Sequence, residues 1–330
     1  MPSYQVLIPA YNAEKWIKET IRSASEQTWP NKEIIIVDDG SIDNTLGIAK
    51  KYESQSVKVI TQENKGASAA RNKALSLAQG DYIQWLDADD LLAPDKISQQ
   101  MRFGDKGNNS RLLLSSAWGR FYFSAQKAKF THHMLWQDLV PAEWLYKNLY
   151  HNVWMSIESW LVSRKLTDLI GPWDEELSID DDGEYFSRIV AASEMINFIQ
   201  EAKSYCRTGN IGSISSEINL SDRKKESLFK SVCLQIDHMR SLEDSERTRD
   251  ACLRFLQRWL IYFYPDRCDI LEKANSVAKD LGGELHAPVL AWTYDMIKQL
   301  FGWKMAKKTQ VAVRQTKVLV KKNWNRLLCC

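Results

Sequence analysis

The chain has 330 residues, 44% hydrophobic and 26% charged, a balance that excludes disordered and fibrous proteins. Its formal net charge of +2 conceals an asymmetry, because residues 301–330 carry eight basic side chains and no acid, which leaves 36 basic against 42 acidic side chains elsewhere. The six cysteines lack CxxC or metal-ligand spacing, which predicts reduced thiols in a cytoplasmic protein. Neither a signal peptide nor a transmembrane helix is predicted.

Short apolar, β-branched runs alternate with segments of helical period over the first hundred residues. This alternation predicts a parallel sheet with helices on both faces. Ligands bind such sheets beyond the carboxyl ends of the strands, where four polar loops are expected here. The predicted strands cover residues 4–8, 33–37, 57–60 and 82–86, and the predicted helices cover 14–27, 45–52 and 66–78.

The second half of the sequence changes from mixed to helical character. The pattern predicts a hairpin over 111–123, helices over 164–170 and 182–192, and strands over 196–199 and 205–207. Further helices are predicted over 222–241, 247–264, 271–281 and 289–301. Strand signals end near Ser215, so we expect an α/β domain over 1–215 and a helical region over 216–330 that ends in a basic amphipathic tail.

Two loops carry residues suited to a nucleotide. In "IIIVDDGSIDNT", turn and cap chemistry accounts for the residues after the glycine, but it explains Asp38 and Asp39 poorly. A carboxylate at a strand end can instead accept the ring N–H of uracil or guanine. In "NKGASAARNKAL", Gly66 opens a helix whose small residues suit tight packing, whereas Arg71 one turn later could face a base or a diphosphate.

The stretch "YIQWLDADDLL" places Asp87, Asp89 and Asp90 directly after a buried strand. Clustered carboxylates repel each other and lose hydration, so a cation is expected there. Mg²⁺ and Mn²⁺ take carboxylate ligands together with phosphate oxygens. Asp87 and Asp89 are therefore the candidate metal ligands, and Asp90 is expected to begin the following turn.

Four motifs resemble the family-2 inverting glycosyltransferases of the GT-A fold: "VLIPAYN" at 6–12, "EIIIVDDGSIDNT" at 33–45, "NKGASAARNKAL" at 64–75 and "GDYIQWLDADD" at 80–90. The resemblance implies a Rossmann-like, mostly parallel mixed sheet flanked by helices. It also implies a donor site in which Asp87 and Asp89 hold the metal and the sugar nucleotide. The implied nucleotide-binding residues are Pro9, Ala10, Tyr11, Asn12, Asp38, Asp39, Asn64, Gly66, Arg71, Asp87 and Arg207.

The resemblance resumes at residues 158–190, where the family carries its catalytic base. It implies Asp182 as the base, with Asp181 as the competitor, whereas the simpler interpretation is that one of three successive aspartates caps the helix. The sequence departs from the family where Asp181 replaces the usual Glu, and where "YCRTGNIGSIS" lacks a His. Arg207 and Ser213 are the remaining candidates in that loop for closing on the diphosphate.

The resemblance implies transfer of a sugar, with inversion, from a nucleotide diphosphate sugar to a hydroxyl of a glycan or lipid-linked acceptor in polysaccharide, lipopolysaccharide or glycan synthesis. A UDP-sugar and Mn²⁺ or Mg²⁺ are expected. The alternatives are a nucleotide-sugar-binding protein without transferase activity and a nucleotidyltransferase-like α/β enzyme. A dehydrogenase is disfavoured because no GxGxxG follows the first strand. Nucleic-acid binding does not suit the acidic body.

The basic tail and three histidines leave alternatives open. Apolar residues at 313, 320, 324 and 327 predict an amphipathic helix, which either packs on its own domain or brings 302–330 to anionic lipid at the inner face of a membrane. His132, His133 and His151 could ligate a metal or contact an acceptor, but for each of them an ordinary structural role is favoured.

Overall fold

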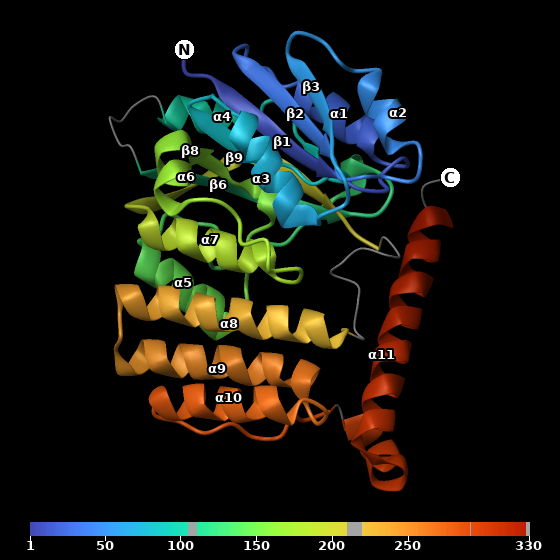
Figure 1. The fold of residues 1–330 in the computed structure, drawn as a ribbon, viewed down its shortest axis with the longest axis vertical. Coiled ribbons are helices and arrows are strands. Elements are labelled where there is room, and N and C mark those ends of the chain that lie inside the picture. The colour runs from blue at the N-terminus through green and yellow to red at the C-terminus, as the bar shows by residue number, and fades with distance from the viewer. Residues whose placement is uncertain (105–110, 210–219, 291, 328–330) are drawn as a thin grey trace.

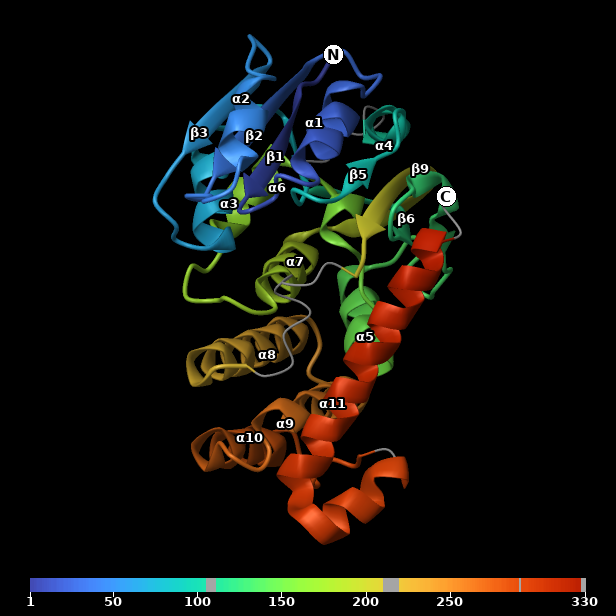
Figure 2. The same cartoon turned by 90° about the vertical axis from the view of Figure 1, so that its right-hand side faces the viewer.

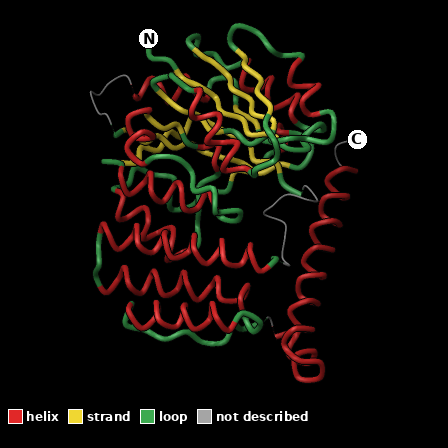
Figure 3. The backbone as a smooth tube through the Cα atoms, in the orientation of Figure 1, coloured by secondary structure: helices red, strands yellow, loops and turns green. Residues whose placement is uncertain are grey.

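The structure is a computed structural model that describes residues 1–104, 111–209, 220–290 and 292–327. A mixed nine-stranded sheet forms one end of the molecule and stacked helices form the other (Figure 1). Figure 3 shows the same division, with the strands gathered in one layer and the helices of residues 222–280 below it.

The first half of the sheet is parallel, as predicted. Its strands lie in the order β3-β2-β1-β4, and the alternating apolar residues of β1 and β2 are buried on both faces because helices cover each side. Predicted and observed ends differ by at most three residues. The strands are β1 Tyr4–Ala10, β2 Lys32–Asp38, β3 Val57–Thr61 and β4 Tyr82–Trp85, and the helices are α1 Ile17–Ser25, α2 Thr45–Lys50 and α3 Ala67–Leu77.

The second half of the sheet corrects two predictions. The expected hairpin over 111–123 is wrong, because β6 (Leu112–Phe121) is one strand, buried along nearly its whole length between neighbours. The two strands expected over 196–199 and 205–207 are one strand, β9 (Met195–Arg207), which pairs parallel with β6 across an irregularity after Ser116. The remaining elements are β5 Leu91–Leu92, α4 Lys96–Gly104, η1 Ala125–Lys127, β7 Lys129–Phe130, η2 Ile157–Ser159 and β8 Leu161–Ser163.

The predicted helices from 164 to 281 match observed ones, whereas α4 and the helix over 141–151 were not predicted. The helix predicted over 289–301 begins too early, since residues 292–294 form a short 3-10 turn and α11 (Asp295–Leu327) begins after it, with a kink at Gly302, where φ is 80°. In the described residues no helix has both the length and the apolar character to cross a membrane. The other helices are α5 Pro141–His151, α6 Arg164–Ile170, α7 Asp181–Ala192, α8 Asp222–Leu242, α9 Glu246–Phe263 and α10 Cys268–Asp280.

The buried apolar residues form two clusters, one on each face of the sheet. The larger one continues from Leu7 in β1 through Tyr185 in α7 to Leu228 in α8 and Ala274 in α10. Figure 2 shows α7 between the sheet and α8. The boundary that we predicted near Ser215 lies outside the described residues.

Candidate active site

A buried arginine joins carboxylates from two distant parts of the chain. Arg71 of α3 donates from Nη1 to Asp181 Oδ2 at 2.6 Å and from Nη2 to Asp87 Oδ1 at 3.0 Å. Its guanidinium lies 4.4 Å from the ring centroid of Trp173. The structure thus brings together three residues that the motifs singled out separately, and it adds the indole that holds the arginine in place.

The electrostatics of this pair of contacts keep Arg71 charged. Burial disfavours the cation, but Asp181 and Asp87 outweigh that cost, and the pKa of Arg71 is raised above its ordinary value. Arg71 was expected to contact the nucleotide. In the structure its two Nη atoms are occupied by carboxylates, so its immediate effect is to fix the position of Asp87 relative to the start of α7.

The two candidate bases at the start of α7 differ in their surroundings. Asp181 accepts hydrogen bonds from Arg71 and, at 3.1 Å, from Ser68 Oγ. Desolvation by the surrounding protein and then repulsion from Asp181 raise the pKa of the Asp182 carboxyl to about 6. The Asp182 side chain is exposed to solvent. Arg71 attracts the Asp182 carboxylate, but among the described residues it donates its hydrogen bonds to Asp181 and Asp87, so Asp182 suits proton abstraction better than Asp181 does.

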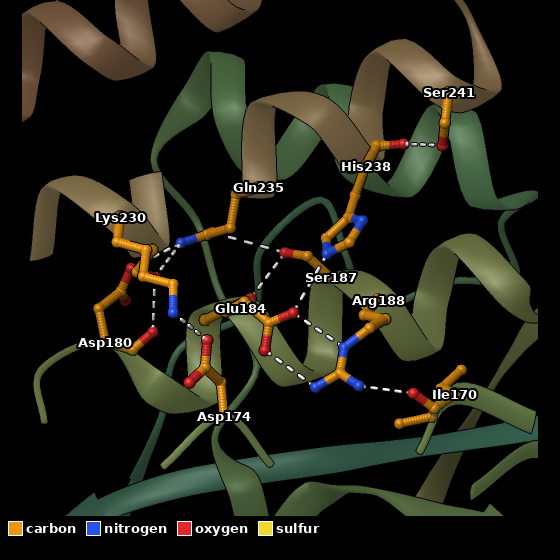
Figure 4. Close-up of polar contacts among 12 residues, drawn as sticks. Ile170, Asp174, Asp180, Glu184, Ser187, Arg188, Lys230, Gln235, His238 and Ser241 are labelled. Atoms are coloured by element: carbon orange, nitrogen blue, oxygen red, sulfur yellow. Dashed lines mark hydrogen bonds and ion pairs between the residues drawn. The ribbon is translucent and has the colours of Figure 1, made fainter. Parts of the chain in front are cut away.

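Polar contacts with α8 hold the first turn of α7 (Figure 4). Asp180 has φ 57° and occupies the cap position, but its side chain makes no cap hydrogen bond. It accepts instead from Ser231 Oγ at 2.9 Å and Gln235 Nε2 at 2.6 Å. The simpler interpretation, an aspartate cap, is therefore wrong for Asp180. A Cβ at Gly183 would lie 2.4 Å from Asp180 Oδ1, so glycine is needed for this arrangement.

A second set of contacts fixes the middle of α7. Arg188 donates to Glu184 at 2.8 Å and to the carbonyl oxygen of Ile170 at 2.5 Å (Figure 4). Glu184 is buried, and His238 Nε2 of α8 lies 3.2 Å from its Oε1. Burial would raise the pKa of Glu184, but His238 and Arg188 hold it below the ordinary 4.5. The stabilisation is therefore complete above about pH 4.5 and is lost as the pH falls through the folded-state pKa.

Replacing Arg188 should destabilise the fold strongly. Arg188→Met leaves the Glu184 carboxylate buried with only His238 beside it, and we expect a loss of about 3 kcal/mol in the free energy of unfolding. The matched control is Arg254→Met, which removes a guanidinium from an exposed i,i+4 pair with Asp250 and should cost less than about 0.5 kcal/mol. Urea denaturation would compare them, and equal losses would contradict this account.

The acidic turn after β4 is held by Arg207. Asp90 closes the turn, with its amide donating to the Asp87 carbonyl oxygen at 3.1 Å, rather than beginning the next one as expected. Its buried carboxylate accepts from the Arg207 amide at 2.6 Å. Arg207 Nε donates to the Asp89 carbonyl oxygen at 2.9 Å, and Nη2 reaches Glu19 Oε2 at 2.6 Å. Arg207 thus lies beside the predicted metal ligands, although its guanidinium is engaged by protein oxygens.

The donor set of this turn fits a hard divalent cation. Asp87 exposes 38% of its side chain, and one of its carboxylate oxygens faces Arg71. Together with Asp89 two residues on, it offers the carboxylate oxygens that Mg²⁺ and Mn²⁺ prefer, on a loop where phosphate oxygens could complete the coordination.

A buried cluster beside this turn escaped the sequence analysis. Ligand atoms of Asp90, Glu158 and Cys206 lie within 4.8 Å of one another. Burial raises the pKa of Asp90 well above its usual range and that of Glu158 to about 7, whereas burial lowers the pKa of nearby Lys96. Glu158 opens the stretch 158–190 that resembles the family, but no local pattern marks it as a neighbour of the acidic turn, and Lys96 lies in no motif.

The two aspartates after β2 have different partners. Asp39 accepts from the Gln62 side chain at 2.8 Å and from the amides of Lys65 and Gly66 at 2.9 and 2.8 Å, so both of its oxygens are used. Asp38 Oδ2 accepts from Ser41, but Asp38 Oδ1 is buried without a partner among the described residues. Of the two, Asp38 therefore has an unused acceptor.

The remaining predicted nucleotide residues surround the ends of β1 and β3. Asn12 Oδ1 accepts from the Ile42 amide at 3.0 Å, which ties the first loop to the second, and Tyr11 is half exposed. Gly66, with φ 95°, occupies the position before α3. Pro9 and Ala10 end β1, and Asn64 lies in the exposed loop after β3. Ser213 lies outside the described residues.

Comparison with known proteins places this arrangement in a family. The profile of glycosyl transferase family 2 matches residues 5–150, from β1 to α5. This part of the chain belongs to glycosyl transferase family 2. The family-2 region therefore contains every predicted donor residue except Arg207, whereas the candidate bases in α7 follow it.

Two curated relatives of the chain share different parts of it. A putative teichuronic acid biosynthesis glycosyltransferase, TuaG of Bacillus subtilis, is 44% identical over 105 residues, or 31% of this chain and 42% of that protein. A cholesterol galactosyltransferase of Borreliella burgdorferi is 26% identical over 78% of this chain and 72% of its own length. The chain spans about two fifths or less of the length of the first curated relatives it matches.

A solved structure extends the likeness to the helical region. S. aureus TarS 1-349, crystallised with UDP-GlcNAc, has a TM-score of 0.60 at 18% identity and covers 87% of this chain and 94% of that one. This confirms the GT-A fold that the motifs implied and the carboxyl-terminal helical region that the helical pattern predicted.

Proposed function

We propose that the protein is an inverting, metal-dependent glycosyltransferase that takes a sugar from a nucleotide diphosphate donor. The proposal rests on one observation. Arg71 bridges Asp87 and Asp181 at the strand ends of the family-2 region, and Asp182, whose carboxyl has a pKa of about 6, lies next to Asp181. A base and a cation-binding turn in one place are what sugar transfer needs.

The mechanism assigns proton transfer to Asp182. Its carboxylate accepts the proton of an acceptor hydroxyl, whose oxygen forms a bond to the anomeric carbon while the bond from that carbon to the diphosphate oxygen breaks. Attack opposite the leaving group inverts the configuration through an oxocarbenium-like transition state. Arg71 and the contacts between α7 and α8 hold Asp182 and Asp87 in fixed relation.

Asp87 and Asp89 would hold the divalent cation, which when bound neutralises charge on the leaving diphosphate. Asp38 Oδ1, the buried acceptor without a partner, would accept the ring N–H of the base. A uridine nucleotide suits that acceptor, and TarS, which shares the fold, was crystallised with UDP-GlcNAc. We therefore propose a UDP-sugar as the donor and Mn²⁺ or Mg²⁺ as the metal.

The experiment that tests this function presents the protein with a panel of nucleotide sugars. With Mn²⁺, we expect slow hydrolysis of one donor and a rise in melting temperature with its nucleoside diphosphate. Binding without hydrolysis or transfer would instead favour a nucleotide-sugar-binding protein. Release of pyrophosphate from a nucleoside triphosphate and a sugar phosphate would favour the nucleotidyltransferase alternative.

The acceptor class and location are also proposals. TuaG is named for a polysaccharide and the Borreliella relative for a lipid, and we propose a glycan or lipid-linked acceptor used at the cytoplasmic face of a membrane. Residues 302–330 would make peripheral contact there. α11 is fixed to the end of α9 by the buried side chain of Ala306 and by Lys307, which donates to the carbonyl oxygen of Ile261. Beside the basic tail, the apolar side chains of Leu300, Phe301 and Met305 are 70%, 68% and 50% exposed.

Charge introduced on this exposed stretch should weaken membrane binding. We expect Leu300→Glu with Phe301→Glu to reduce co-sedimentation with vesicles of phosphatidylglycerol and phosphatidylcholine by about 10-fold. Leu169→Glu, at an apolar residue of α6 that is 60% exposed, is the matched control. Unchanged sedimentation of the double variant would instead favour a helix that packs on its own domain and does not bind the membrane.

A further inference from the structure

An arginine near the carboxyl end of β6 lies against two tryptophans whose rings also contact each other. The Arg120 guanidinium is 5.2 Å from the ring centroid of Trp118 and 5.2 Å from that of Trp154. Within the described residues, Arg120 forms no ion pair and its side chain donates no hydrogen bond. Contacts with indole faces hold a guanidinium through its plane, which leaves its N–H edge available to an anion.

The surroundings of Arg120 are cationic or neutral. His133 lies beside Trp118, with ring centroids 6.5 Å apart, and burial, then His132 and Arg120, lower the pKa of His133 to about 4. The neutral His133 ring adds no charge, and among the described residues no acidic side chain forms an ion pair with Arg120. Lys129 of β7 is the sheet partner of Arg120, so this part of the sheet carries positive charge in a chain whose first 300 residues carry more acid than base.

The position of the cluster relates it to the reacting groups. Arg120 is the sheet partner of Cys206 in β9, whose thiol lies within 4.8 Å of Asp90, next to the metal-binding candidate Asp89. Trp118 belongs to the same buried cluster as Tyr185 of α7, so it lies on the face of the sheet that α7 covers. The cluster therefore lies beside the donor turn, on the face of the sheet that α7 covers.

We propose that Arg120, with Trp118 and Trp154, forms an acceptor subsite that binds an acidic group, a carboxylate or a phosphate, of the acceptor glycan. This inference rests on the proposed function, because an acceptor subsite presupposes transfer. Arg120 binds the anion through its N–H edge. Trp154, which is 49% exposed, offers an indole face to the apolar side of a sugar ring.

The test compares charged ligands with their neutral partners in binding measurements. Saturation-transfer NMR titrations would use p-nitrophenyl β-glucuronide against p-nitrophenyl β-glucoside, and glycerol 3-phosphate against glycerol, with and without UDP. We expect the protein to bind one charged member about 10-fold more tightly than its neutral partner. The two pairs distinguish a carboxylate from a phosphate as the ligand.

Variants identify the group responsible. Arg120→Ala should abolish the preference, and Arg120→Lys should retain part of it. Arg254→Ala is the matched control, because Arg254 also lies over an aromatic ring, that of Tyr150, but away from the sheet. Trp154→Ala should weaken glucuronide and glucoside alike.

Two outcomes would overturn the proposal: equal binding of charged and neutral ligands, or a preference that survives Arg120→Ala. UDP binding, measured separately in each variant, reports on the proposed function. If the unmodified protein did not bind UDP, that result would count against the proposed function. If it bound UDP but bound charged and neutral ligands equally, the result would count only against the subsite.

Discussion

Asp182→Asn should reduce sugar transfer by about 10² to 10⁴-fold while leaving the affinity for the donor within about twofold, because the amide fills the same space but cannot accept a proton. The same residue should set the acid limb of the pH profile. With a pKa of about 6 for the Asp182 carboxyl, the base is protonated at lower pH, so kcat/KM should fall tenfold per unit below about pH 6. Initial rates with the active donor, together with donor binding by calorimetry, would measure both effects.

The control for this experiment is Asp181→Asn. Asp181 accepts from Arg71 and Ser68, so its amide should disturb the site by releasing Arg71 and should lower the melting temperature. We expect a smaller loss of transfer than for Asp182→Asn, and an acid limb that remains near pH 6. A larger loss for Asp181→Asn, with Asp182→Asn still active, would reverse the assignment.

Asp89→Ala should remove the part of donor binding that depends on metal. We expect the Kd for the nucleoside diphosphate in Mn²⁺ to rise at least 10-fold, to the value found in EDTA, because a carboxylate ligand of the cation is lost. Calorimetric titrations of both proteins, each with Mn²⁺ and with EDTA, would separate the metal-dependent part from the rest.

Asp90→Asn is the matched comparison for the metal prediction. Asp90 is buried and accepts the Arg207 amide, which an asparagine oxygen can also do, so the turn should keep its shape. We expect less than a threefold change in the Mn²⁺-dependent Kd, together with a change in melting temperature. If Asp90→Asn lost metal dependence and Asp89→Ala kept it, Asp89 would not be the ligand.

The parallel half of the sheet was predictable because its signals are local. Each of β1 to β4 is a short apolar run followed by a polar loop, and the observed strands lie within three residues of the predicted ones. The second, mixed half was not predictable, because the apolar run of β6 could equally form a hairpin, and only its pairing with β9 and β8 shows that it is one strand. Such pairing depends on residues about 80 positions apart, which no local pattern records.

The candidate site divides in the same way. The motifs identified Arg71, Asp87 and Asp181. The ion pairs that Arg71 forms with Asp181 at 2.6 Å and with Asp87 at 3.0 Å depend on how α7 lies against α3. The different partners of Asp38 and Asp39 depend on the loop after β3. Arg120 lies outside every motif and Glu158 only opens the stretch 158–190, and only the assembled fold places them beside the acidic turn.

The hydrogen bonds between the start of α7 and α8 have a consequence for engineering acceptor specificity. One way to change acceptor specificity is to exchange domains between glycosyltransferases. Our predicted boundary near Ser215 would be the natural point at which to join two proteins. Asp180, however, binds Ser231 and Gln235 across that point, and the larger buried cluster crosses it as well. A chimera joined there would inherit one helix of a pair without its partner, so the candidate base Asp182 and α8 should be transferred together.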